Sequence, residues 1–252
     1  MPDQPELFNL MYFRISLLAL LASLVLSCSN HASEDPTAIM PANGNSGTAK
    51  PDSSKTAPSL DSLLTKYDPP DRVLWQKPEL VIQKMGDLEN KVVADIGAGS
   101  GFFSRRLAQH AKKVIAVEVD PRFIHFMDSI KLVELAPEYQ KRFETRLATY
   151  DNSKLKPGEA DIILVVNTYI YFQNRVQYLR HLLEVLPDDG QLVIVDFKKK
   201  RLPISYPPQD IRLELWRVEK ELQQAGFNNI VSDDCSLDYQ YIVTARKGRQ
   251  VQ

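Results

Sequence analysis

VVADIGAGSGFF, residues 92–103, places three glycines within five positions directly behind a run of apolar, mostly β-branched residues. The apolar run predicts a short buried strand, and the pattern after it predicts a helix that begins at Phe102. Glycine has no Cβ, so the turn between them can bring bare backbone close to a ligand. The start of the helix adds free N–H groups, which favour a carboxylate or a phosphate. The stretch therefore predicts a strand, a ligand-binding loop and a helix.

The chain after residue 67 continues this alternation of strands and helices. Strands are predicted at 91–96, 114–119, 143–147, 161–166, 191–197, 229–233 and 239–245, and helices at 78–85, 102–108, 122–135, 175–186 and 211–225. The segments DIILVV (161–166) and QLVIVDF (191–197) are apolar on both faces, which is typical of parallel strands covered by helices on both sides. We therefore predict an α/β fold with a doubly wound, mostly parallel, seven-stranded Rossmann-like sheet.

The composition is that of a globular protein of 252 residues, 44% hydrophobic and 25% charged, long enough for one substantial domain and additional segments. The formal net charge of -1 gives no electrostatic reason to expect a nucleic-acid partner. The two cysteines, Cys28 and Cys235, cannot supply a disulfide framework. We expect Cys235 to be a half-buried structural thiol.

The N-terminal region carries an apolar run at residues 15–26, preceded by Arg14. It is too short for a membrane-spanning helix, which needs about 20 residues, and it has the length of a signal-peptide core. The run ends in VLSC (25–28), which resembles the bacterial lipobox and implies lipidation of Cys28. An ordinary buried helix or a plain cleaved signal are the alternatives, and translation from Met11 would give a conventional signal start.

Residues 29–60 are rich in Ser, Pro, Ala, Thr, Asn and Gly, and they contain almost no large apolar side chains. Such a segment cannot bury enough surface to offset its ordering entropy. We therefore predict a signal peptide with lipobox at 1–28, a disordered tether at 29–60 and a folded domain at 61–247. The resemblance to lipoproteins implies an outer-membrane or periplasmic location, and the alternative is the cytoplasm if the signal is not used.

The spacing of the glycines, G-x-G-x-G at 97–101, restricts the choice of ligand. A dinucleotide fingerprint would need glycine at position 102, where this chain has Phe102, so a nicotinamide dehydrogenase is disfavoured. The stretch VADIGAGSGFFSRRLA resembles motif I of class I S-adenosylmethionine-dependent methyltransferases. The resemblance implies that S-adenosyl-L-methionine is the cofactor, and that it is bound by Asp95, Gly97, Ala98, Gly99 and Gly101.

Acidic residues follow the next two strands. Glu118 closes the second strand, where a carboxylate can accept both ribose hydroxyls of a nucleoside. The resemblance gives this role to Glu118, and we expect Asp120 to cap the helix that begins at Pro121. Asp151 follows the third strand, and the resemblance implies that it lies beside the adenine. A plain polar loop is the alternative at that position.

Polar and aromatic residues follow the fourth predicted strand, at the expected mouth of the pocket. We predict that Asn167 contacts the cofactor and that Tyr169 and Tyr171 line a substrate pocket, whereas Phe172 fits the core equally well. Related enzymes often carry histidines here, and this chain has Ile170 and Tyr171. The catalytic residues therefore stay undefined, and no metal site is predicted.

Two functions are compatible with these features. The resemblance covers residues 67–246. This part of the chain is similar to small-molecule methyltransferases of the quinone-biosynthesis kind. It implies methyl transfer from S-adenosyl-L-methionine to a small-molecule or lipid acceptor, with a membrane as a further partner through the anchor on Cys28 and no nucleic acid. The alternative is a membrane-tethered binding or scaffold protein that keeps the fold without turnover, because a lipobox places the domain outside the cytoplasm while the methyl donor is cytosolic.

Overall fold

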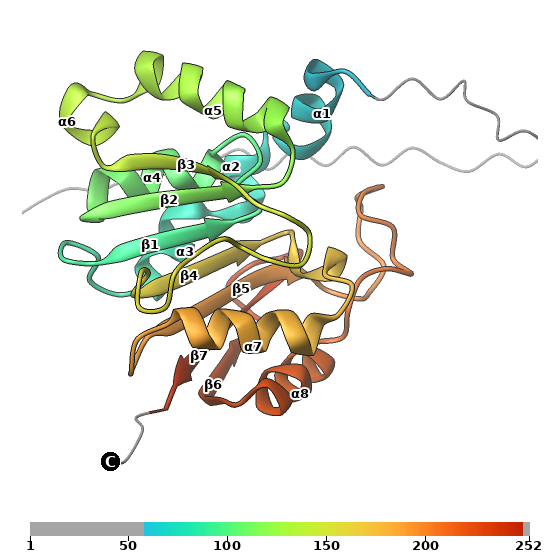
Figure 1. Cartoon of the computed structure of the whole chain (residues 1–252). Coiled ribbons are helices and arrows are strands. Elements are labelled where there is room, and N and C mark those ends of the chain that lie inside the picture. The colour runs from blue at the N-terminus through green and yellow to red at the C-terminus, as the bar shows by residue number, and fades with distance from the viewer. Residues whose placement is uncertain (1–57, 249–252) are drawn as a thin grey trace, which may run out of the picture. The chain divides into compact units, whose positions relative to one another are not determined.

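A seven-stranded sheet forms the centre of the protein, which the computed structural model describes over residues 58–248 (Figure 1). In chain order the strands are β1 (Val92–Ile96), β2 (Lys113–Glu118), β3 (Phe143–Leu147), β4 (Ile162–Val166), β5 (Gln191–Phe197), β6 (Phe227–Asp233) and β7 (Gln240–Lys247). Their order in the sheet is β3-β2-β1-β4-β5-β7-β6. The first five strands are parallel, and β7 runs antiparallel to both β5 and β6. The predicted doubly wound, mostly parallel sheet is confirmed.

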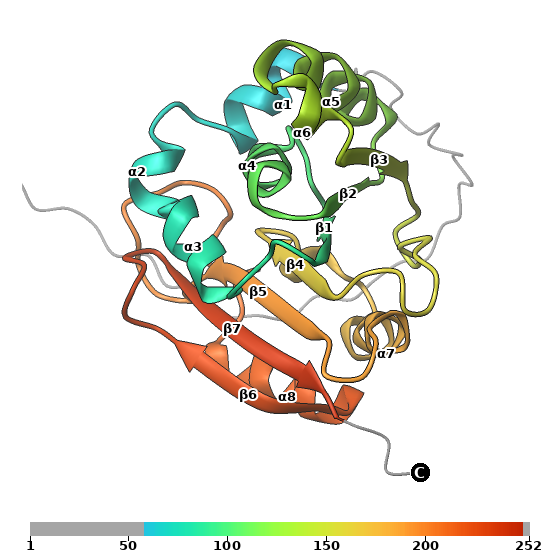
Figure 2. The same cartoon turned by 90° about the vertical axis from the view of Figure 1, so that its left-hand side faces the viewer.

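Helices cover both faces of the sheet (Figure 2). One face packs against α3 (Pro78–Lys84), α4 (Phe102–His110) and α5 (Pro121–Glu134), and the other packs against α7 (Arg175–Val185) and α8 (Leu215–Ala225). Neighbouring residues of one strand point to opposite faces, as Val93 and Ala94 of β1 do. Both faces of β1, β4 and β5 are therefore buried, which explains their continuous apolar runs.

Four short elements lie outside the predicted pattern: α1 (Leu60–Tyr67), α2 (Arg72–Gln76), α6 (Pro137–Gln140) and the 3-10 turn η1 (Tyr169–Tyr171). Helix α1 begins where the side chain of Ser59 accepts a hydrogen bond from the backbone N–H of Ser62, at 3.2 Å. Such a cap satisfies a backbone donor that the first turn of a helix leaves free. The predicted signal peptide, Cys28 and most of the predicted tether lie outside the described residues.

Helix α8 begins later than expected, at Leu215 and not at residue 211. The reason is Arg212, which is 2% exposed and donates from Nε to the carbonyl of Pro207 at 2.9 Å and from Nη1 to the carbonyl of Lys200 at 3.1 Å. These bonds hold residues 198–214, which we call the strap, in an irregular conformation between β5 and α8. In Figure 1 the strap and α1 both lie at the end of the sheet toward which β1, β2 and β4 point, where these strands have their carboxyl ends.

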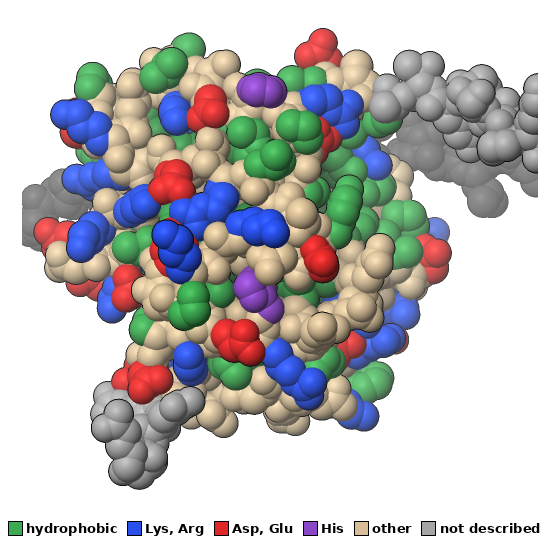
Figure 3. Space-filling view, in the orientation of Figure 1, with side chains coloured by type: hydrophobic (Ala, Val, Ile, Leu, Met, Phe, Trp, Pro, Cys, Tyr) green, Lys and Arg blue, Asp and Glu red, His purple; other side chains and the backbone are tan. Residues whose placement is uncertain are grey.

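The described part of the chain contains no helix with the length and apolar character needed to cross a bilayer. Strand β3 is an edge strand of the sheet, and Lys and Arg side chains gather in this region (Figure 3). Arg146 on this strand pairs with Glu144 and Glu159. Charged side chains on an edge strand discourage pairing with a second chain.

Candidate active site

The glycine loop, residues 97–101, connects β1 to α4 and is held to the neighbouring strand by its backbone. The N–H groups of Gly97 and Ala98 both donate to the carbonyl of Val117 in β2, at 2.8 and 3.1 Å. At Gly97 the backbone has φ +74°, and an added Cβ would lie 2.4 Å from Oγ1 of Thr168. Glycine is therefore required here both by the backbone conformation and by the close approach of the residues after β4.

Gly99 has φ +54°, and an added Cβ would meet no atom within 4 Å. Its backbone thus borders open space, so a ligand can lie against it. Gly101 has φ +77° and stands at the start of α4, where it is not part of the cavity wall. Of the predicted loop residues, Gly97, Ala98 and Gly99 line the cavity, together with Ser100.

Asp95 lies behind the loop and not on the cavity wall. Its side chain is 3% exposed, and its Oδ2 accepts a hydrogen bond from Oγ of Ser104 in α4 at 2.6 Å. Burial raises the pKa of Asp95 to about 6, although the bond from Ser104 and the charge of Arg72 act in the opposite direction. The structure therefore makes Asp95 a brace between β1 and α4, and its binding of the cofactor stays a prediction.

Glu118 ends β2 with its carboxylate held by three backbone donors. Its Oε2 accepts from the N–H of Gly99 at 2.8 Å, and its Oε1 accepts from Val119 at 2.7 Å and from Asp120 at 3.1 Å. Each carboxylate oxygen can accept two hydrogen bonds, so Oε1 is fully used and Oε2 keeps one acceptor position for a ligand hydroxyl. Asp120 caps α5 as expected, because its Oδ1 accepts from the N–H of Arg122 at 2.9 Å.

A cavity of about 380 Å³ lies at the carboxyl ends of β1, β2 and β4, and the glycine loop and Glu118 form part of its wall. Its other walls come from α1, from the ends of β2 and β4, from residues 148–150 and from α5. The volume falls within the range of small-ligand pockets, about 300 to 1,000 Å³. Helix α1, which contributes Leu63 and Tyr67 to the wall, has no counterpart among the predicted elements.

Arg72 of α2 lines the cavity and was not predicted from the sequence. It is only 8% exposed, its Nε donates to Oε1 of Gln76 at 2.6 Å, and its Nη1 donates to the carbonyl of Tyr67 at 3.0 Å. Asp68 lies 3.8 Å from Nη1, and the guanidinium stands 4.1 Å above the ring of Phe102. Burial lowers the pKa of Arg72 to about 10, so the group keeps its positive charge at neutral pH.

The residues after β4 divide between the cavity and the core. Asn167 lines the cavity, and its Oδ1 accepts a hydrogen bond from Nε2 of Gln240. Tyr171 also lines the cavity and is 43% exposed. Tyr169 does not: it is fully buried, and its hydroxyl donates to Oε2 of Glu221 at 2.6 Å. The prediction of Tyr169 as a pocket residue is therefore wrong, because a 3-10 turn directs it into the core.

Phe172 is 8% exposed and belongs to the core cluster, while part of it reaches the cavity wall. Asp151 is exposed, accepts a hydrogen bond from Oγ1 of Thr149 at 2.7 Å and is not a cavity residue. The residues directly before Asp151, 148–150, line the cavity. Asp151 is thus better described by the polar-loop alternative.

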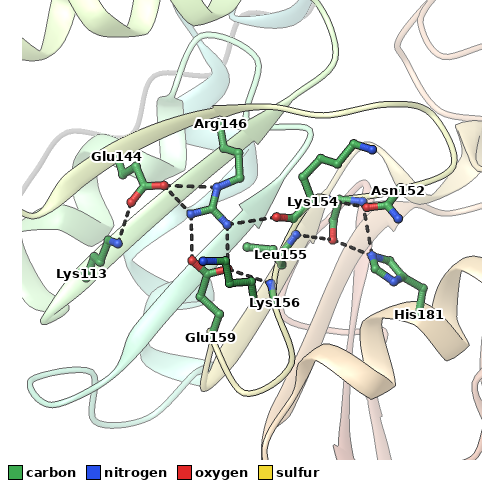
Figure 4. Close-up of polar contacts among 10 residues, drawn as sticks. Lys113, Glu144, Arg146, Asn152, Lys154, Leu155, Lys156, Glu159 and His181 are labelled. Atoms are coloured by element: carbon green, nitrogen blue, oxygen red, sulfur yellow. Dashed lines mark hydrogen bonds and ion pairs between the residues drawn. The ribbon is translucent and has the colours of Figure 1, made fainter.

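The segment that carries residues 148–150 is fixed by polar contacts on its outer side (Figure 4). Arg146 donates from Nη1 to Oε2 of Glu159 at 2.7 Å, and the same oxygen accepts from the N–H of Lys156 at 2.8 Å. Nε2 of His181 contacts Oγ of Ser153 at 2.8 Å. His181 therefore packs against this segment and lies outside the cavity wall, which agrees with its position on a helix.

Cys235 is exposed, so the expectation of a half-buried thiol is wrong. It follows β6 in a turn where Oδ1 of Asp233 accepts from its N–H at 3.1 Å. Between residues 58 and 248, no three His, Cys, Asp or Glu side chains come together in a way that could hold a metal ion.

Comparison with known proteins gives a consistent result. Residues 94–194 match a family model described as a methyltransferase domain. An uncharacterized methyltransferase of Exiguobacterium sibiricum is 22% identical over 181 residues, which cover 70% of this chain and 74% of that protein. Ribosomal RNA small subunit methyltransferase A of Staphylococcus carnosus is 28% identical over 132 residues, 50% of this chain and 38% of that protein.

Among solved structures, a SAM dependent methyltransferase from Aquifex aeolicus superposes with a TM-score of 0.66 at 23% identity. The match covers 76% of this chain and 100% of the other. At this level of identity the superposition shows the fold, and the functional argument depends on the cavity residues.

Proposed function

We propose that this chain is a methyltransferase that uses S-adenosylmethionine. It transfers the methyl group of S-adenosylmethionine to a small molecule held in the cavity between the glycine loop, η1 and α1. One observation gives the strongest support for this cavity as the cofactor site. Glu118 and the glycine loop border the same cavity, and Oε2 of Glu118 lies 2.8 Å from the N–H of Gly99. A nucleoside held by the carboxylate would therefore lie directly against backbone that has no side chain.

The nucleoside end of S-adenosylmethionine fits the wall at β2. The three backbone donors fix the orientation of the Glu118 carboxylate before any ligand binds, so little ordering is needed on binding. We propose that Oε2, which keeps one acceptor position, accepts a ribose hydroxyl. The apolar side chain of Phe123 and the segment 148–150 border the same part of the cavity and would enclose the adenine.

The amino-acid end fits the wall between the glycine loop and α2. A carboxylate there would meet the guanidinium of Arg72, a buried cation that lines the cavity with Gly97 and Ser100. Asp68 is 3.8 Å from that guanidinium and also accepts from Oγ of Ser100 at 2.6 Å, so it is shared between two partners. We propose that Arg72 is the principal cation for the carboxylate of the cofactor.

When bound, the cofactor supplies a methyl group that is already activated by the positive charge on sulfur. The chain's own task is then to hold donor and acceptor in line and to exclude water, for which no acid or base is needed. Leu63 and Tyr67 of α1 close the cavity on the side opposite the sheet. The absence of an evident catalytic base among the cavity residues of the described chain is compatible with this chemistry.

A small-molecule acceptor is favoured over RNA by the form of the cavity. Tyr67 of α1 and Tyr171 of η1 line the cavity, and its wall includes only two basic side chains, Arg72 and Arg122. Arg122 is paired with Asp120. Binding of nucleic acid depends on a run of basic side chains that contact phosphates. A lipid acceptor is the second candidate, because the apolar run at residues 15–26 would place the domain near a membrane.

The test is a calorimetric titration of the full-length protein with S-adenosylhomocysteine, the product form of the cofactor. We expect Glu118→Gln to weaken binding by about 1 to 3 kcal/mol, since it removes a charged acceptor of a ribose hydroxyl. Asp151→Asn is the matched control and should leave the affinity unchanged. No saturable binding of either S-adenosylhomocysteine or S-adenosylmethionine at millimolar concentration would refute the proposal.

We further propose that Cys28 is lipidated and that residues 29–60 tether the domain, 61–247, to a membrane outside the cytoplasm. The support is the signal-like run and the lipobox resemblance. Cys28→Ala should move the protein from the membrane fraction to the soluble fraction. If the variant stays in the membrane fraction, lipidation is not the anchor. The scaffold alternative would be favoured by tight cofactor binding without methyl transfer to any acceptor.

A further inference from the structure

The position of the acceptor follows from the two ends of the cofactor, so this inference rests on the proposed function. With the ribose at Glu118 and the carboxylate at Arg72, the sulfur lies between them. The residues after β4, among them Asn167 and Tyr171, border the cavity on its remaining side. The acceptor must approach the methyl group from that side, because the glycine loop and β2 occupy the other.

Three tyrosines from distant parts of the chain meet there: Tyr67 at the end of α1, Tyr171 of η1 and Tyr206 of the strap. The hydroxyls of Tyr171 and Tyr206 are joined by a hydrogen bond. The rings of Tyr67 and Tyr206 are 5.7 Å apart between centroids and meet edge to face at 66°. Tyr67 and Tyr171 line the cavity and are 37% and 43% exposed. This tyrosine cluster offers aromatic surface to a flat ligand.

The cluster also carries donors and a positive charge. Nζ of Lys66 lies 3.8 Å from the ring centroid of Tyr206 and 5.0 Å from that of Tyr67. Burial raises the pKa of the Tyr171 hydroxyl, and burial together with the bond to Tyr171 raises that of Tyr206. Both phenols therefore keep their protons at neutral pH, and because one hydroxyl donates to the other, the pair has one proton left to donate to a ligand. A phenol donor beside an ammonium group favours an anionic oxygen.

No group on the cavity wall is positioned to remove a proton from the acceptor. The carboxylates on the wall are Glu118, which accepts three backbone N–H groups, and Asp120, which binds Arg122. Asp196 lies near the cluster, but it is fully buried, and its oxygens accept from the N–H groups of Ile170 and Phe197 at 3.3 and 2.8 Å. Within the described residues, no histidine lines the cavity. An acceptor suited to this site therefore needs a lone pair that is available without a base, and the donors of the cluster favour an ionised oxygen.

We infer that the acceptor is a small planar aromatic acid, a carboxylate or an acidic phenol, which is methylated on an oxyanion held by the tyrosine cluster and Lys66. In the transfer the bond between the methyl carbon and sulfur breaks, and its electron pair stays on sulfur. The oxyanion forms the new bond to carbon. The positive charge on sulfur and the negative charge on the acceptor both disappear, and no proton has to leave.

The test measures binding of four probes to full-length protein that is saturated with S-adenosylhomocysteine. The probes are benzoate, 4-nitrophenolate, benzylammonium and cyclohexanecarboxylate. At least one aromatic anion should bind about tenfold more tightly than the aromatic cation and the non-aromatic anion. Benzoate and 4-nitrophenolate distinguish a carboxylate acceptor from a phenol.

Two variants assign the effect to the cluster. Lys66→Gln and the double variant Tyr171→Phe, Tyr206→Phe should each weaken binding of the preferred anion by about fivefold or more. The matched controls are Lys112→Gln and Tyr139→Phe, which change the same residue types away from the tyrosine cluster and should have no effect.

Three results would overturn the inference: binding of benzylammonium as tight as that of the anions, no binding of any probe, or equal anion affinity in the Lys66 variant. The same samples keep the two hypotheses apart. If S-adenosylhomocysteine itself does not bind, the proposed function fails. If it binds and the anions do not, only the acceptor class is wrong.

Discussion

The two sides of the cavity are built in different ways. The cofactor wall, residues 95–120, comes from one continuous strand–helix–strand segment, and backbone hydrogen bonds hold the glycine loop and Glu118 in place. The acceptor cover consists of α1, η1 and the strap, and side-chain contacts join these segments across more than a hundred residues of sequence. We therefore expect substitutions in the wall and in the cover to have separate effects.

The largest expected effect separates two glycines within the cofactor wall. Gly97→Ala should lower the free energy of unfolding by about 2 to 5 kcal/mol, because it combines a left-handed backbone with a Cβ placed 2.4 Å from Thr168. Gly99→Ala should lower the free energy of unfolding by about 1 kcal/mol, because the alanine would have a left-handed backbone but its Cβ would clash with nothing. Urea unfolding of the two variants measures the difference. Equal losses would show that the approach of the β4 loop does not constrain the wall.

The second effect concerns the brace behind the wall. Asp95 has a pKa of about 6 in the folded protein against an ordinary value of 3.8, so the folded state holds this proton more tightly than the unfolded state. As pH rises from about 4 to 6, the wild type should therefore lose stability, by up to about 3 kcal/mol from this group. Asp95→Asn should lack this part of the slope. The measurement is urea unfolding from pH 4 to 8, and identical slopes would contradict the buried-carboxyl assignment.

The third effect tests where the wall meets the cover. Arg72→Gln should weaken binding of S-adenosylhomocysteine by about 1.5 to 3 kcal/mol, the range for a hydrogen bond to a charged group. It should not change binding of 5′-methylthioadenosine, which has the nucleoside but no carboxylate. Arg106→Gln is the matched control, because its guanidinium lies 4.0 Å from the same Phe102 ring. A loss shared equally by both ligands would argue for a structural role of Arg72.

The smallest effect belongs to the cover. Tyr206→Phe removes the hydroxyl that bonds Tyr171 and should cost about 1 kcal/mol of stability. Hydrogen exchange should become faster at amides of the strap, while the amides of residues 97–101 keep their rates, because no contact of Tyr206 supports the loop. Faster exchange in both segments would mean that the wall and the cover do not behave independently.

The same contrast explains what the sequence could predict. The glycine loop, the acid that ends β2 and the cap formed by Asp120 depend on residues that are close in sequence, so spacing was enough to identify them. Arg72 enters the site only because α2 packs on Phe102, and no local signal marks it. Tyr169 and Tyr171 are equivalent in the sequence, and the 3-10 turn sends one to Glu221 in the core and the other to the cavity.

Tertiary contacts account for the other differences. The family resemblance implies a position beside the adenine for Asp151, whereas the structure has it exposed, with its carboxylate accepting a hydrogen bond from Thr149. The strap stays irregular because Arg212 binds its carbonyls, a contact that propensity does not reveal. Helix α1 begins inside a serine-rich composition, where a single cap at Ser59 starts it.

The most direct test of the account is a crystal structure of the protein with S-adenosylhomocysteine bound. We expect a ribose hydroxyl to donate to the Glu118 carboxylate, the amino-acid carboxylate to face Arg72 and the glycine loop, and the sulfur to face the tyrosine cluster. A ligand bound outside this cavity, or a ribose held by Asp120 or Asp151 in place of Glu118, would contradict it.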